Sequence, residues 1–212
     1  MVSDHSNNKN ILSFWDSYYK NKSQTFPNSD FSLYCLSFLG KESSLIDIGC
    51  GDGRDSLFFS KNHIYTTGID FSSEVIKRNI KLENNYLKFL NIDLNSLNEL
   101  KLEFDFAYCR FLFHAISHEI EDILFQWLIK NINKEIFIET RIYDEEVSQI
   151  NESHFRRYFT EQEFIEKINN LGFSILYSES SRTFSRYKDI YKVEDLKTDP
   201  LLLRVVISKK NK

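Results

Sequence analysis

Glycine and alanine are scarce in this chain. Only six of its 212 residues are glycine, and Ala107 and Ala115 are its only alanines. An average composition would give about fifteen glycines in a chain of this length. Three of the six fall within five residues, at Gly49, Gly51 and Gly53. We therefore expect this window to need backbone positions where no side chain is tolerated.

Other scarce features narrow the class of protein. No run of about 18 apolar residues is present, so we expect no transmembrane helix. The polar residues 1–9 lack the apolar core of a signal peptide, and the three cysteines form no C-x-x-C pair, which together predict a cytoplasmic protein with reduced thiols. A net charge of -4 disfavours the basic surface of a nucleic-acid binder, so no nucleic-acid partner is expected.

Short apolar runs alternate with amphipathic segments, a pattern typical of a parallel sheet covered by helices on both faces. We expect one α/β domain over residues 1–212, with an N-terminal helical cap at 1–43 and the sheet-containing core at 44–212. The predicted strands are 44–48, 65–69, 87–91, 104–109, 135–139, 173–178 and 202–208. The predicted helices are 11–19, 31–39, 54–62, 72–80, 120–128 and 160–171.

The glycine window follows the first predicted strand. The turn Gly49–Gly53 leaves the carboxyl end of that strand, and ligands of open α/β sheets bind beyond such ends, where glycine lets the backbone come close. Asp70 follows the next predicted strand and Asp93 the third, so three strand ends offer polar groups to one crevice. We therefore expect a nucleotide-type ligand there, with Asp70 accepting hydrogen bonds from ribose hydroxyls.

The spacing and charge of this turn distinguish between two cofactors. A dinucleotide fingerprint, G-x-G-x-x-G, needs a third glycine where this chain has Arg54. Asp52 and Asp55 stand on either side of that position, and two carboxylates there would repel a pyrophosphate. They are compatible with a ligand that carries an ammonium and a sulfonium, so the turn favours S-adenosylmethionine over NAD.

These segments together resemble the class I S-adenosylmethionine-dependent methyltransferases. Residues 45–55 (LIDIGCGDGRD) resemble motif I of that family, and residues 68–72 (GIDFS) resemble its ribose-binding motif. Residues 91–94 (NIDL) resemble the segment that flanks adenine, and residues 104–110 (FDFAYCR) the motif of the fourth strand. The resemblance implies a Rossmann-like, seven-stranded sheet whose last strand runs antiparallel, and an enzyme whose product is S-adenosylhomocysteine.

The resemblance also implies which residues hold the cofactor. Asp47 and the glycines would hold the methionine end, Asp70 the ribose, and residues 91–94 the adenine. The residue after the fourth strand often borders the methyl group in this family, which points to Arg110 and Phe111. The chain has no Asn-Pro-Pro-Tyr and no Pro-Cys, so N-methylation of DNA adenine or glutamine loses support and C5 methylation of cytosine is not expected. The implied cofactor residues are Asp47, Gly49, Cys50, Gly51, Arg54, Asp70, Phe71, Ser72, Asp93, Leu94 and Arg110.

Polar residues after the fourth and fifth strands are candidates for the site of the methyl acceptor. Transfer from a sulfonium depends mainly on alignment, and a base is needed only where the nucleophile must lose a proton. An anionic acceptor would need cationic side chains, whereas a hydroxyl would need a base such as His114, which is equally well explained as a core histidine. The predicted catalytic residues are His114, Arg110 and Tyr108, and the predicted acceptor-binding residues are Tyr19, Arg141, His154, Arg156, Arg157 and Tyr158.

Structural roles compete with ligand binding at several of these positions. His114 and His118 are four residues apart and would share a helix face, but without further ligands we predict no metal site. Arg156 and Arg157 either hold an anionic group or pair with the glutamates of residues 161–163. The aromatic residues near the start of the chain either cover the ligand or pack in the core.

The two ends of the chain carry a further resemblance. Residues 15–27 and 156–206 resemble small bacterial methyltransferases of surface-polysaccharide gene clusters, which implies O-methylation of a small anionic acceptor: a phosphoramidate or sugar group of a capsular polysaccharide precursor. The opening also resembles tellurite and thiopurine methyltransferases, so detoxifying methylation of a thiol or chalcogen stays open, as does a non-catalytic module that binds S-adenosylmethionine. The expected partner is a small-molecule acceptor, and the expected assembly is a monomer or homodimer.

Overall fold

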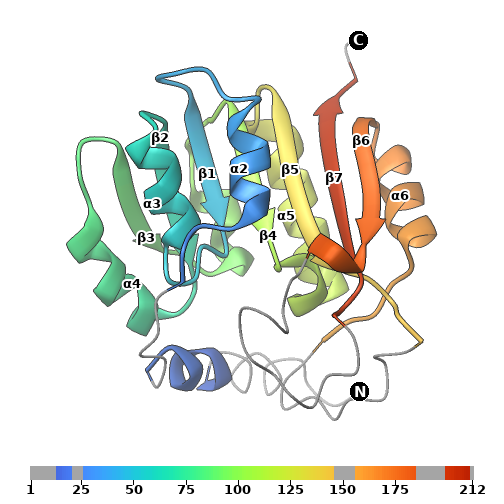
Figure 1. Cartoon of the computed structure of the whole chain (residues 1–212), viewed down its shortest axis with the longest axis horizontal. Coiled ribbons are helices and arrows are strands. Elements are labelled where there is room, and N and C mark those ends of the chain that lie inside the picture. Colours follow the sequence, from blue (N-terminus) through green and yellow to red (C-terminus); the bar gives the residue numbers. More distant parts are fainter. Residues whose placement is uncertain (1–12, 21–25, 146–155, 185–198, 211–212) are drawn as a thin grey trace.

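A seven-stranded sheet forms the centre of the computed structural model, which describes residues 13–20, 26–145, 156–184 and 199–210 (Figure 1). The strand order is β3-β2-β1-β4-β5-β7-β6. Strands β1 to β5 pair in parallel, whereas β7 runs antiparallel to both β5 and β6. This confirms the predicted Rossmann-like α/β fold. The strands are β1 (Ser44–Ile48), β2 (Tyr65–Asp70), β3 (Leu87–Asn91), β4 (Phe106–Arg110), β5 (Glu135–Arg141), β6 (Phe173–Ser181) and β7 (Leu202–Lys209).

Helices connect the strands, and four of them begin at a capping side chain. Ser29, Ser72, Ser117 and Thr160 each accept a hydrogen bond from a backbone N–H of the first helical turn, which satisfies a donor that has no partner within the helix. Residues 13–20 are also helical and are called the N-terminal helix below. The other helices are α2 (Asp30–Leu36), α3 (Arg54–Lys61), α4 (Ser73–Asn79), α5 (His118–Asn131) and α6 (Glu161–Asn170), and the short 3-10 helices are η1 (Ile80–Leu82), η2 (Leu94–Glu99), η3 (Phe113–Ala115) and η4 (Arg182–Phe184).

Successive strand residues contribute to two cores on opposite faces of the sheet. On one face Ile46, Ala107 and Ile138 pack with apolar residues of α5 and α6. On the other face Leu45 and Phe137 pack with residues of α2 and α3, the two helices that lie in front of the sheet in Figure 1. A residue's place in this alternation therefore decides which face its side chain reaches.

Several details of the sequence-based prediction were wrong, among them the end of the predicted helix 31–39, which stops at Leu36. Strand β4 starts two residues later than predicted, because Phe104 instead forms an isolated bridge with Ile132, just beyond α5. His114 and His118 do not share a helix face. His114 belongs to η3 and His118 begins α5, with Ile116 extended between them (φ -119°, ψ 155°).

The carboxyl ends of the parallel strands meet at one edge of the sheet, and the N-terminal helix, blue in Figure 1, lies beside that edge. Asp16 of this helix accepts a hydrogen bond from the hydroxyl of Ser72, which caps α4. Tyr19 packs against the small apolar cluster that contains Cys50 and Val75. These contacts hold the N-terminal helix against the turns that follow β1 and β2.

The turn after β1 is built from left-handed backbone. Gly49, Gly51 and Gly53 have φ angles of 74°, 53° and 72°, which glycine adopts without steric cost. A Cβ added to Gly51 would lie 2.6 Å from the hydroxyl of Tyr19, and one added to Gly53 would lie 2.7 Å from the ring of Phe89. The expectation that this window excludes side chains is confirmed.

We expect Gly53→Ala to cost more stability than Gly172→Ala. Both glycines have left-handed φ, 72° and 85°, but a Cβ at Gly172 meets nothing within 4 Å. The left-handed backbone alone costs an alanine about 1–2 kcal/mol, and the overlap of Gly53→Ala with Phe89 adds about 1–3 kcal/mol. Urea unfolding of the two variants measures both losses. Equal losses would show that the contact with Phe89 does not constrain the turn.

Candidate functional site

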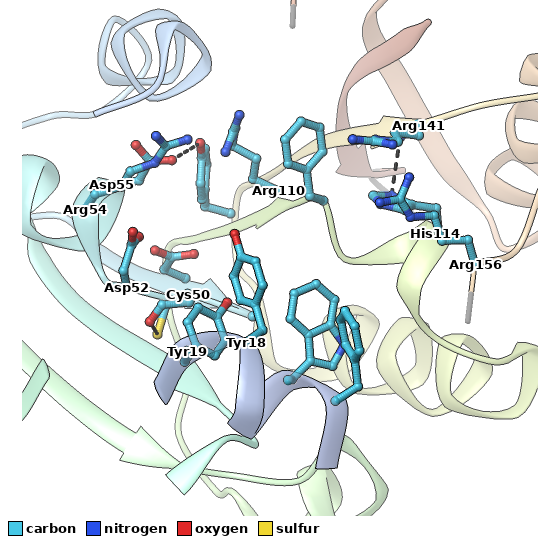
Figure 2. A pocket seen from close by; sticks show the side chains of 17 residues that line it. Tyr18, Tyr19, Cys50, Asp52, Arg54, Asp55, Arg110, His114, Arg141 and Arg156 are labelled. Carbon is cyan, nitrogen blue, oxygen red and sulfur yellow. Dashed lines mark hydrogen bonds between the residues drawn. The ribbon is translucent and has the colours of Figure 1, made fainter. Parts of the chain in front are cut away.

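A cavity of about 340 Å³ opens where β1 and β4 end, and the N-terminal helix forms one of its walls (Figure 2). Small-molecule and cofactor sites commonly measure about 300–1,000 Å³. The predicted site residues that line it are Tyr19, Asp47, Gly49, Cys50, Gly51, Arg54, Tyr108, Arg110, His114, Arg141 and Arg156. The other lining residues are Phe14, Trp15, Tyr18, Asp52, Asp55 and Phe111.

Asp47 is the buried carboxyl group of this cavity. It lies in β1, only 2% exposed, and accepts a hydrogen bond from the hydroxyl of Ser56 in α3 at 2.5 Å. Burial raises the pKa of Asp47 to about 8, in spite of that hydrogen bond, and the nearby carboxylates of Asp55 and Asp70 raise it further. A cation bound beside Asp47 would favour its ionised form, so the group is suited to receive an ammonium.

Asp55 and Tyr108 both line the cavity and are joined in one network. Asp55 accepts hydrogen bonds from the backbone N–H of Ser29 at 2.7 Å, from the Ser29 hydroxyl at 2.9 Å and from the Tyr108 hydroxyl at 2.9 Å. Its oxygens therefore also hold α2 and β4 in place. Burial raises the pKa of the Tyr108 hydroxyl well above its ordinary value. Through its hydrogen bond to Asp55, the predicted catalytic residue Tyr108 has a structural role.

Asp70 fastens the glycine turn to the end of β2. Its two carboxylate oxygens accept hydrogen bonds from the backbone N–H groups of Gly51 at 3.0 Å and Ser72 at 2.9 Å. These bonds oppose the effect of burial, which nonetheless raises the pKa of Asp70 to about 6. Burial, together with the nearby carboxylates of Asp70 and Asp52, raises the pKa of the Tyr19 hydroxyl well above its ordinary value. Asp70, Phe71 and Ser72 themselves are not cavity-lining residues.

The predicted adenine segment lies outside the cavity. Asp93 caps η2, accepting hydrogen bonds from the backbone and side-chain nitrogens of Asn95 at 2.9 and 2.8 Å. Leu94 is half-buried and packs against the larger core. Both residues follow β3, which lies beyond β2 from the glycine turn, so they would contact only a ligand that extends past Asp70.

Two arginines and a histidine gather at the other end of the cavity. Figure 2 shows His114, Arg141 and Arg156 together, away from the acidic side with Asp52 and Asp55. Phe111, which follows β4, lies between the two ends. The guanidinium carbons of Arg110 and Arg141 are 4.1 and 5.9 Å from the centroid of the Phe111 ring. Phe111 has a φ of 57°, a left-handed conformation that is unusual for a phenylalanine.

The hydrogen bonds of His114 define its tautomer. This side chain is buried, and its Nδ1 accepts a hydrogen bond from the backbone N–H of Arg141 at 3.4 Å and lies 3.2 Å from the Thr140 hydroxyl. A backbone N–H can only donate, so in the neutral ring the proton is on Nε2. His114 is then set to donate a hydrogen bond from Nε2, which is the opposite of what a general base requires.

Arg157 and Tyr158 are not part of the cavity lining. The guanidinium of Arg157 forms a two-pronged ion pair with Glu121 of α5, with N–O distances of 2.8 and 2.9 Å. Its backbone N–H also donates to the carbonyl oxygen of His114 at 2.8 Å. The predicted pair of acceptor-binding arginines is thus divided: Arg156 reaches the cavity, whereas Arg157 pairs with Glu121 and not with residues 161–163. His154 lies outside the described residues.

Phe14 is a lining residue that the sequence reasoning did not single out. It packs on Trp15 and Tyr18, with ring centroids 5.3 and 6.4 Å apart. The signal was present, because Phe14 and Tyr18 are four residues apart and so share one face of the N-terminal helix. That face, with Trp15, forms the aromatic wall of the cavity.

No cluster of three histidine, cysteine or acidic side chains in the described ranges could hold a metal ion. Within the same ranges, no helix has the length and apolar character needed to cross a membrane.

The family comparison and the solved structures agree on the fold. Residues 45–129 match the family model described as "Methyltransferase domain", and no curated protein matches the chain. The 1,6-didemethyltoxoflavin-N1-methyltransferase of Burkholderia thailandensis, solved with S-adenosylhomocysteine, has a TM-score of 0.73 and 18% identity over 100% of this chain and 92% of that chain. The magnesium protoporphyrin IX methyltransferase of Synechocystis PCC 6803, also solved with S-adenosylhomocysteine, has a TM-score of 0.64 and 12% identity over 99% of this chain and 89% of that chain.

A third similar structure shows that this fold also serves other chemistry. The [4+2]-cyclase SpnF has a TM-score of 0.70 and 16% identity over 96% of this chain and 94% of that chain. At such identities the likeness establishes the fold, and the family match to the segment that carries the glycine turn identifies the chemistry. The matched residues 45–129 begin within β1 and contain the glycine turn and strands β2 to β4 of the sheet, and the activity is that of an S-adenosylmethionine-dependent methyltransferase, whose cofactor is S-adenosylmethionine.

Proposed function

We propose that this methyltransferase methylates an anionic oxygen of a small acceptor, with a phosphoramidate or sugar group of a capsular polysaccharide precursor as the candidate. The observation that carries the proposal is the cationic end of the cavity, where His114, Arg141 and Arg156 face the same space. Arginine pairs with phosphate-like and carboxylate groups through several parallel hydrogen bonds, so these side chains would hold a small anion near Phe111.

The opposite end of the cavity fits the amino-acid part of the cofactor. S-adenosylmethionine, when bound, supplies an electrophilic methyl group on a sulfonium. The left-handed glycine turn lets a ligand approach the backbone closely, as a side chain at Gly51 would not. We assign Asp47 to the ammonium, Arg110 to the carboxylate and Asp70 to the ribose hydroxyls, because each charge or acceptor suits its partner.

The hydrogen bonding of the candidate bases favours an acceptor that is already ionised. His114 accepts at Nδ1, which leaves its proton on Nε2, and the Tyr108 hydroxyl donates to Asp55. Neither group is set to remove a proton from a nucleophile. An anionic oxygen needs no base, and alignment beside a hydrogen-bond donor is then the main contribution of the protein. This favours a phosphoramidate over a neutral sugar hydroxyl.

Cofactor affinity should depend on pH through Asp47. Its folded-state pKa of about 8 means that the carboxyl group is largely protonated at pH 6.5, and binding an ammonium requires the charged form. The Kd of S-adenosylhomocysteine should therefore fall as pH rises from 6.5 to 8.5, by up to about tenfold per unit below the pKa. Calorimetric titration at several pH values checks this.

Asp47→Asn is the matching variant. It should bind S-adenosylhomocysteine weakly and lose this dependence, while Asp122→Asn, at an exposed position on α5, should behave like the parent. Because the folded pKa of Asp47 lies above its unfolded value, ionisation destabilises the unliganded protein as pH rises toward 8, so Asp47→Asn should unfold at a higher temperature than the parent at pH 8.5. A parent protein with a flat affinity profile would contradict the role given to Asp47.

The acceptor class can be tested by methyl transfer to a panel of small molecules. With radiolabelled S-adenosylmethionine, we expect transfer to an O-alkyl phosphoramidate but not to a neutral sugar, a thiopurine or tellurite. Arg156→Met should raise the KM for the phosphoramidate at least tenfold without changing the Kd of S-adenosylhomocysteine, because one charge-assisted contact is lost. Lys134→Met, whose cation lies over Phe106 on the opposite side of the sheet from α5, is the matched control. Transfer to the thiopurine alone would establish the detoxifying alternative, and cofactor binding without transfer to any member would favour a binding module.

Variants of His114 distinguish a donor from a base. A donor role predicts that His114→Gln, whose amide can donate, keeps much more kcat than His114→Ala, and that kcat of the parent changes little between pH 6 and 9. A base role predicts that both variants are equally inactive and that kcat of the parent falls as the pH is lowered. Steady-state kinetics on the best acceptor of the panel decides between the two.

A further inference from the structure

A row of buried charges crosses three strands beside the cavity. The sheet register pairs Arg110 of β4 with Glu139 of β5, and Glu139 with Arg204 of β7. Nε of Arg110 donates to Oε1 of Glu139 at 2.8 Å, and Nε of Arg204 donates to Oε2 at 2.7 Å. The side chain of Glu139 is 1% exposed, so this carboxylate is shared between two arginines away from water.

Only one of the two arginines reaches the cavity. Arg110 lines it, with its guanidinium carbon 4.1 Å from the centroid of the Phe111 ring. Arg204 lies on the other side of Glu139, where its guanidinium carbon is 4.0 Å from the centroid of Phe184 and 5.1 Å from that of Phe31. A planar guanidinium that is bonded at Nε and stacked on a ring has a fixed orientation, and for Arg110 that orientation is set from outside the cavity.

The row continues to β6. The register pairs Arg204 with Glu179, so positive and negative side chains alternate from Arg110 to Glu179. Each oxygen of Glu139 accepts a hydrogen bond from one arginine, so the carboxylate is held on both sides and gives Arg110 a fixed direction.

The position of Arg110 indicates which anion this is. Asp47 of β1 pairs in register with Tyr108 of β4, so Gly49 and Arg110, two residues further on each strand, are neighbours at the carboxyl edge. Arg110 is also close enough to lower the pKa of Asp47. Asp47 and Arg110 thus present a negative and a positive charge side by side at the glycine turn, which matches the ammonium and carboxylate of an amino acid.

We propose that Glu139 and Arg204 are positioning residues, which hold the guanidinium of Arg110 to bind the methionine carboxylate of the cofactor. The proposal rests on the cofactor site assigned above and is independent of the acceptor. Glu139 fixes the direction of Arg110, and Arg204 holds the second oxygen of Glu139. Neither residue touches the cofactor.

Two ligands that differ by one carboxylate test this proposal. S-adenosylhomocysteine carries the carboxylate, whereas its decarboxylated form, S-adenosyl-3-thiopropylamine, keeps the adenosine, the sulfur and the amine. The ratio of their Kd values, measured by calorimetry, reports the carboxylate contact. We expect a ratio of about 10- to 100-fold for the parent, as charge-assisted hydrogen bonds give, and a ratio near one for Arg110→Met.

The positioning residues should change this ratio and leave the affinity for the decarboxylated ligand within about twofold of the parent value. In Glu139→Gln the ratio falls, although the net positive charge has increased, because Arg110 has lost its orientation. In Arg204→Met it falls because the second oxygen of Glu139 is no longer held, and Arg204→Lys, which keeps a charged donor at this position, restores much of it.

Equal loss of affinity for both ligands in the Glu139 and Arg204 variants would show a merely structural role and overturn the proposal. If the ratio were unchanged in Arg110→Met but fell to near one in Arg54→Met, the carboxylate would bind Arg54, and the proposal would also be overturned. Because Glu139→Gln removes a buried charge and can fail to fold, the two variants Arg204→Met and Arg204→Lys provide the independent test. Failure of the acceptor panel would leave this result unaffected.

Discussion

The arrangement of the whole site depends on the left-handed backbone of the turn after β1. Three glycines adopt φ angles that most residues avoid, and Tyr19 and Phe89 pack where their side chains would have been. The turn lets α3 begin directly beneath the strand end, so that the Ser56 hydroxyl reaches Asp47. It also brings the N–H of Gly51 to Asp70. The same backbone that leaves room for the ligand thus holds two of the acids proposed to bind it.

Charge is separated along the cavity. The carboxyl of Asp47 lies buried at the glycine turn, whereas His114, Arg141 and Arg156 lie at the far end. A sulfonium cofactor and an anionic acceptor would each meet charge of the opposite sign, and their own mutual attraction would favour the alignment that in-line transfer needs. Burial strengthens these interactions but also raises the pKa of Asp47 to about 8, so the affinity for the cofactor should depend on pH.

Sequence reasoning succeeded where local pattern decides the structure. The strands and the glycine turn follow from apolar periodicity and from the clustering of glycine, and the cavity opens at the strand ends where ligands of such sheets bind. It failed where the partner is distant in the chain. The residues near Arg157 in the sequence do not indicate its partner Glu121. The row through Glu139 and Arg204 forms only because β7 lies between β5 and β6, and the order of the strands in the chain does not predict that register.

The two ends of the cavity are joined through Phe111. Its φ of 57° is a conformation that costs an ordinary side chain about 1–2 kcal/mol, so its surroundings must hold it there. The Phe111 N–H donates to the carbonyl oxygen of Glu139 at 2.8 Å, and its ring lies between Arg110 and Arg141. Glu139 therefore fixes both the guanidinium proposed for the methionine carboxylate and the ring that borders the acceptor end. The carboxyl end of β5, where Glu139 and Arg141 lie, thus sets the geometry at both ends of the cavity.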